Sequence, residues 1–144
     1  MKAREFIDRL DESKIVAEIA AAERNTSGEI RVFISRRTPE DVVARARERF
    51  EKLGMTRTRH RNAVLIYFAP RVRKFAVIGD RGVHEKCGEA FWEETVAEIA
   101  GELRAERFTE AVQDAVRKIG ALLAAHFPPE PGNANELPND LLRD

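Results

Sequence analysis

Residues 61–82 read RNAVLIYFAPRVRKFAVIGDRG, which places two apolar runs on either side of a basic turn. This pattern predicts a β-hairpin with strands over 63–68 and 75–78. Antiparallel pairing brings the start of the first strand beside the end of the second, so Asn62 and Asp80 become neighbours. Gly79 and Gly82 flank Asp80 and permit backbone angles that other residues resist. We therefore expect a carboxylate to be presented at this edge of the sheet.

A further strand and a helix precede the hairpin. Alternating apolar positions predict a strand over 29–35. Thr38 as N-cap, Pro39 at the first helical position and Gly54 after the last turn predict a helix between them. A strand, a helix and a strand in succession imply a right-handed crossover and parallel strands. The predicted fold is therefore α/β, with a small mixed sheet of three to four strands and helices on both faces.

Three further helices are expected, over 8–24, 89–104 and 109–126. The apolar stripe of the second helix of the chain includes Val43, and that of the third includes Trp92 and Val96. Two prolines, at 128 and 129, should end the last helix.

The chain is interpreted as a single domain over 1–129 followed by a tail over 130–144. The tail is rich in proline, asparagine and acid, and its leucines could dock on the domain or engage a partner. These leucines are Leu137, Leu141 and Leu142.

Charge and cysteine content restrict the function. Acidic and basic residues number 25 each, which argues against a general nucleic-acid binder because phosphate backbones attract a positive field. Cys87 is the single cysteine, so no intramolecular disulfide can form. The first ten residues lack an apolar core, and no apolar run is long enough to span a membrane. We expect a soluble, cytoplasmic monomer.

Three polar residues should meet at one end of the sheet. If the first two strands are parallel and the third returns, Glu29, Asn62 and Asp80 share that end. Two carboxylates and an amide oxygen are ligands suited to a hard divalent cation, and we expect calcium in preference to magnesium. Arg59 and Arg61 lie beside them in a basic loop and could hold an anion or a partner, together with Gly79 and Gly82.

Each of these residues also has a purely structural interpretation. Asp80 could be a turn residue that bonds its own backbone, Glu29 a solvated or ion-paired residue, and Asn62 a backbone cap. Open parallel sheets usually bind ligands at the carboxyl ends of their strands, and this cluster is at the opposite end.

The opposite end of the sheet carries a second candidate. Four arginines should gather there beside the start of the second helix, where they form either an anion site or a solvated basic rim. They are Arg36, Arg37, Arg71 and Arg73. The histidines are scattered and lack the spacing of a zinc site, and Cys87 has no surroundings that mark a catalytic thiol.

An ordered set of motifs resembles the TPM domain family, and more narrowly its short, stand-alone bacterial branch. The motifs are residues 26–32 (TSGEIRV), 53–55 (LGM), 61–62 (RN), 79–83 (GDRGV), 91–92 (FW), 127–128 (FP) and 135–138 (NELP). The resemblance implies an α-β-α sandwich with a Rossmann-like central sheet. It also implies divalent-cation binding, often of calcium, in an acidic cleft. Asp80 and the region of Glu29 match family motif positions.

Two functions follow from these expectations. The first is a cation-binding module that recognises or assembles with an unidentified protein partner or a phosphorylated small molecule. The alternative is a metal-dependent acid phosphatase of low activity, as some relatives of the family are described. It is favoured by the basic loop beside the carboxylates.

Overall fold

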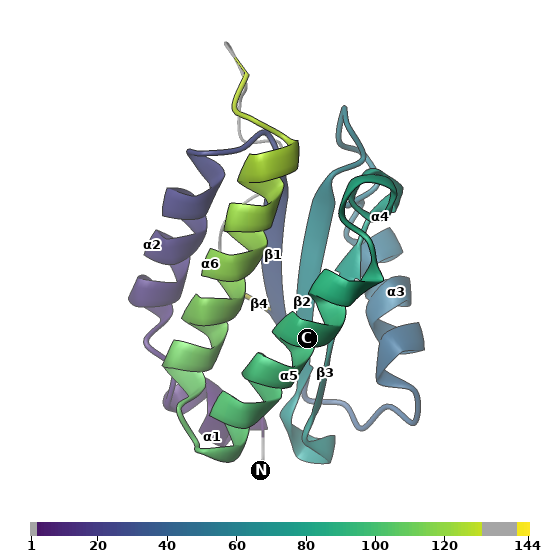
Figure 1. The fold of residues 1–144 in the computed structure, drawn as a ribbon. Coiled ribbons are helices and arrows are strands. Elements are labelled where there is room, and N and C mark those ends of the chain that lie inside the picture. The colour runs from purple at the N-terminus through teal and green to yellow at the C-terminus, as the bar shows by residue number, and fades with distance from the viewer. Residues whose placement is uncertain (1–2, 131–140) are drawn as a thin grey trace.

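The computed structural model describes residues 3–130 and 141–144, which form a four-stranded sheet and its covering helices (Figure 1). The strand order is β3-β2-β1-β4. The strands are β1 (Glu29–Ile34), β2 (Ala63–Ala69), β3 (Lys74–Gly79) and β4 (Leu142–Arg143). The helices are α1 (Ala3–Asp8), α2 (Glu12–Glu23), α3 (Val42–Lys52), α4 (Arg81–Cys87), α5 (Glu89–Arg104) and α6 (Phe108–His126), and the short 3-10 helix is η1 (Pro70–Val72).

The strand directions are those that the sequence predicts. β1 and β2 are parallel with Glu29 opposite Ala63, and β2 and β3 are antiparallel with Val64 opposite Gly79. The basic turn of the hairpin is η1, which Arg73 closes in the left-handed conformation with φ 55°. β4 adds a short parallel strand to the outer edge of β1.

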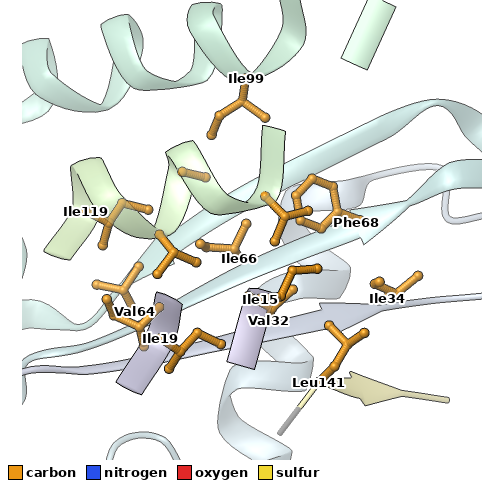
Figure 2. Close-up of a cluster of buried hydrophobic side chains, with 14 of the residues drawn as sticks. Ile15, Ile19, Val32, Ile34, Val64, Ile66, Phe68, Ile99, Ile119 and Leu141 are labelled. Atoms are coloured by element: carbon orange, nitrogen blue, oxygen red, sulfur yellow. The ribbon is translucent and has the colours of Figure 1, made fainter. Parts of the chain in front are cut away.

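Both faces of the sheet are covered, as an α/β sandwich requires. Alternate residues of β1 and β2 pack on the helices of one face, where Ile15 and Ile19 of α2 and Ile119 of α6 complete the core (Figure 2). On the other face, Phe33 and Tyr67 stack at 5.4 Å between ring centroids and pack with Phe50 of α3. Because both faces are covered, all residues of β1 and β2 are buried.

Helix starts are where the structure departs from the sequence prediction. The helix expected over 8–24 is divided into α1 and α2, because Asp11 accepts a hydrogen bond from the Lys14 amide at 3.2 Å and begins a new helix. α3 begins at Val42 and not at Pro39, because the Asp41 carboxylate caps it through the Ala44 amide at 3.0 Å. α4 and β4 were not predicted.

Some predicted core positions are exposed, and one tail residue is buried. Val43 and Val96, assigned to apolar stripes, are exposed. Leu141 packs into the core beside Val32 and Ile34 (Figure 2), which confirms that part of the tail docks on the domain. Leu137 and the side chain of Trp92 lie outside the described residues.

Candidate functional site

The backbones of the three predicted site residues lie together at one end of the sheet, which we call the rim. The Glu29 amide donates to the Asn62 carbonyl at 3.4 Å, and the Asp80 amide donates to the Ala63 carbonyl at 2.9 Å. Glu29, Asn62 and Asp80 therefore begin or end neighbouring strands at the same end of the sheet, the upper end in Figure 1. α4 and the loop before β2 lie at this end as well.

Asp80 forms the strongest polar contact of the rim. Its carboxylate accepts two hydrogen bonds from Arg61, from Nε at 2.6 Å and from Nη2 at 2.8 Å. It also accepts from the Arg81 amide at 2.8 Å and so caps α4. The Asp80 side chain is 5% exposed and that of Arg61 is 33% exposed. The hydrogen bond with Asp80 raises the pKa of Arg61.

Asn62 is buried and its side chain turns toward the chain segment before β1. Its Nδ2 donates to Ser27 Oγ at 3.3 Å, and its backbone amide donates to Thr58 Oγ1 at 3.3 Å. Thr26 Oγ1 in turn donates to the Phe127 carbonyl at 2.5 Å. Asn62 therefore links the segments before β1 and β2 through a side-chain hydrogen bond, whereas the sequence suggested a cation ligand or a backbone cap.

Glu29 contacts a carboxyl group that the sequence analysis did not single out. Glu23, at the end of α2, forms a hydrogen bond with the Glu29 side chain and accepts from the Ile30 amide at 2.9 Å. Burial, followed by this carboxyl–carboxyl contact, raises the pKa of Glu23 to about 9. Arg31 is buried nearby and its charge opposes that rise. Glu23 is thus protonated at neutral pH.

The three predicted cation ligands share a rim, but their side chains bind three different partners. Within residues 3–130 and 141–144, no three His, Cys, Asp or Glu side chains form a group able to hold a metal ion. Asp80 instead lines a pocket of about 300 Å³ with Glu48 and Glu51 of α3. Neither acid was predicted from the sequence as part of the site. Both lie on the polar face of a helix that packs on β3, and this position could have indicated that they lie near Asp80.

Two of the remaining anion candidates, Arg59 and Gly82, contact different partners at this end of the sheet. Arg59 and His60 both contact Glu130, at 3.6 Å and 2.6 Å. Gly82 donates its amide to the Arg61 carbonyl at 3.0 Å, and a Cβ there would lie 2.5 Å from the His60 carbonyl oxygen. This glycine therefore allows the basic loop to lie directly against α4. A pocket of about 290 Å³ opens beside it.

Comparisons with known proteins agree with the fold. The TPM domain family matches residues 1–122. A solved structure, the BA42 protein from the psychrophilic bacterium Bizionia argentinensis determined by NMR, is similar with a TM-score of 0.86 and 36% sequence identity. The match covers 92% of this chain and 92% of that one. No match was found among curated proteins. The chain belongs to the TPM domain family.

In the described part of the chain, none of the helices is both long and apolar enough to cross a bilayer.

Proposed function

We propose that this TPM domain is a recognition module that binds a divalent cation at Asp80, with calcium preferred to magnesium. The observation that carries the proposal is the Asp80 carboxylate, which is 5% exposed and is held on both oxygens by a single guanidinium. The guanidinium of Arg61 already occupies the position that a metal ion would take. The Arg61 side chain is itself one-third exposed.

Exchange of Arg61 for a metal ion is physically reasonable. Removing the counterion from a buried carboxylate is costly unless another cation replaces it. Glu48 and Glu51 line the same pocket and would add negative charge around the ion. Calcium accepts six to eight oxygens in flexible geometry, including water, and so suits an open acidic pocket better than magnesium does. Glu29 and Asn62 would support this site from the backbone, since their side chains are engaged elsewhere.

Cation binding would also create an anion site. Displaced from Asp80, Arg61 would present its guanidinium beside the bound ion, with Arg59 in the same loop. Such a pair suits an acidic protein segment or a phosphorylated small molecule. The same proposal includes a cytoplasmic location, with which the single cysteine is compatible, and a monomeric state, which the pairing of β4 along the edge of β1 favours.

Calorimetric titration with calcium and with magnesium tests this function. Arg61→Gln should bind calcium about fivefold more tightly, the gain expected if Arg61 occupies the site in about four of five molecules. Asp80→Asn should abolish binding while α4 stays capped, because asparagine is an equally good N-cap. Arg57→Gln, an exposed change in the same loop, controls for net charge. Calcium binding by Asp80→Asn equal to that of the unaltered chain would refute the assignment.

Weak phosphatase activity is the second candidate, favoured by the contact of Arg61 with the same carboxylate that would hold the cation. Hydrolysis of an aryl phosphate should then depend on added calcium or magnesium and should be lost in Asp80→Asn. Equal slow rates in both proteins would contradict this function and leave the recognition role untouched.

A further inference from the structure

A basic pocket lies at the end of the sheet opposite Asp80. It has a volume of about 550 Å³ and lies where β1 and β2 reach their carboxyl ends. Four arginines, Arg36, Arg37, Arg45 and Arg71, line it with the 38–39 loop, and Asp144 is the single acid among the described residues of its lining. Ligands of open α/β sheets usually bind at this end of the strands. We call it the arginine pocket.

The carboxylate of Asp144 is bound in this pocket as an anionic ligand would be. It accepts from Ser35 Oγ at 2.5 Å and from the Arg36 amide at 2.8 Å. The guanidinium Nε atoms of Arg36 and Arg37 lie 3.8 Å and 3.7 Å from its oxygens. Its side chain is only 10% exposed. A hydroxyl, a backbone amide and two guanidinium groups are the donors that oxyanion sites combine.

The donors are also held by contacts that do not involve Asp144. The Ser35 amide donates to the Phe68 carbonyl at 2.8 Å, which fixes this residue to the end of β2. Ser35 Oγ accepts from the Arg37 amide at 3.1 Å, and Arg71 Nη1 donates to the Arg36 carbonyl at 3.3 Å. Ser35 and the backbone of Arg36 are therefore positioned by the sheet and the hairpin turn, and they would stay in place if the Asp144 carboxylate left.

One carboxylate does not exhaust the pocket. Arg45 is paired with Glu48 at 3.5 Å and not with Asp144, and Arg71 has no acidic partner among the described residues. A phosphoryl group carries up to two negative charges and three free oxygens, which matches the excess of guanidinium groups better than a carboxylate does. The volume of the pocket, about 550 Å³, is also much larger than the volume of a carboxylate group.

We propose that the arginine pocket binds a phosphoryl group and that Asp144 is its internal competitor. Asp144 reaches the pocket through β4, which pairs with β1 at two register positions, Phe33 with Leu142 and Ile34 with Arg143. A ligand that replaces the Asp144 carboxylate leaves this pairing in place, so competition requires only the Asp144 side chain to move.

Titration of the full chain with inorganic phosphate, followed by calorimetry and by the amide NMR signals of Ser35 and Arg36, tests the proposal. Asp144→Ala should bind phosphate about tenfold more tightly, as expected if the carboxylate fills the site in about nine of ten molecules. Phosphate should shift both amide signals. Arg37→Gln combined with Asp144→Ala should lose most of that gain.

Three controls test whether the change in phosphate affinity is specific to the arginine pocket. Glu94→Ala makes the same charge change on an exposed position of α5 and should leave phosphate affinity unchanged. Asp80→Asn should also leave it unchanged, which separates this pocket from the rim at the other end. Acetate at equal concentration should bind more weakly than phosphate. Equal gains in Glu94→Ala and Asp144→Ala, unshifted amides, or acetate binding as tightly as phosphate would each overturn the proposal.

Discussion

At the residue scale, Gly82 occupies a position in the rim that has no space for a larger side chain. A Cβ at this position would lie 2.5 Å from the His60 carbonyl oxygen and 2.6 Å from that of Arg61, both of them backbone atoms that cannot rotate away. Gly82→Ala should therefore destabilise the fold by about 1–3 kcal/mol, measured by urea denaturation. It should also weaken the contact between Arg61 and Asp80, because the loop that carries Arg61 must move.

Gly101 provides the matched control for this substitution. It lies inside α5, and a Cβ there meets nothing within 4 Å. Gly101→Ala should therefore stabilise the protein by up to about 1 kcal/mol through helix propensity. If both alanine variants changed stability in the same direction, the steric explanation for Gly82 would be wrong.

The Glu23–Glu29 contact predicts that stability falls as pH rises. The pKa of Glu23 is about 9 in the folded protein, against 4.5 when unperturbed, so between these values the folded state holds a proton that the unfolded state has lost. The contribution is fully present below pH 4.5 and is lost as pH rises toward 9. Its slope is at most about 1.4 kcal/mol per pH unit.

Glu23→Gln should remove that slope, because glutamine mimics the protonated acid and can still accept from the Ile30 amide. At pH 8 the variant should be more stable than the unaltered protein by about 1–3 kcal/mol. Denaturation curves at pH 6, 7 and 8 measure the effect, with Glu94→Gln as an exposed control. A Glu23→Gln protein that kept the full pH dependence would show that another group is responsible.

These residues also show how far the site could be predicted. That Glu29, Asn62 and Asp80 share a rim follows from strand direction alone, and the structure places their backbones there. The partners of the Glu29 and Asn62 side chains do not follow, because Glu23 and Ser27 reach the rim from segments whose approach depends on the whole fold. Arg61 was expected to face an anion, and the anion it faces is Asp80 itself.

At the scale of elements, periodicity predicted helices and strands better than it predicted where they begin. β1, β2 and β3 were all expected, and so were α5 and α6 within one residue at their starts. The starts of α2 and α3 were misplaced because Asp11 and Asp41 cap these helices, whereas the starts were expected at residue 8 and after Thr38. Both kinds of residue are good N-caps, so local sequence did not separate them.

The displaced start of α3 has a consequence for the arginine pocket. Because α3 begins at Val42, the residues expected to form its first turn remain a loop, and Thr38 and Pro39 line the pocket. The expected gathering of arginines at this end is confirmed for Arg36, Arg37 and Arg71, which line the pocket with Arg45. The part played by Asp144 could not be foreseen, because β4 is only two residues long and carries no periodic signal.

At the scale of the whole molecule, the outer edge of β1 is covered by two segments, the end of α2 and β4. Glu23 accepts from the Ile30 amide near the start of β1, and β4 pairs with Phe33 and Ile34 near its end. Leu141 adds an apolar contact in the core beside Ile34 (Figure 2). An uncovered strand edge is a template for pairing with another chain, so this cover favours the monomer.

Removal of residues 141–144 should therefore both destabilise the protein and make it self-associate. Loss of the buried Leu141 side chain alone should cost about 2–5 kcal/mol, and the exposed edge of β1 offers free backbone groups to a second copy. Thermal unfolding and sedimentation at several concentrations measure the two effects. Asp144→Ala keeps Leu141 and β4 and should remain monomeric at every concentration. A shortened chain that stayed monomeric with unchanged stability would show that β4 neither completes the core nor protects the sheet edge.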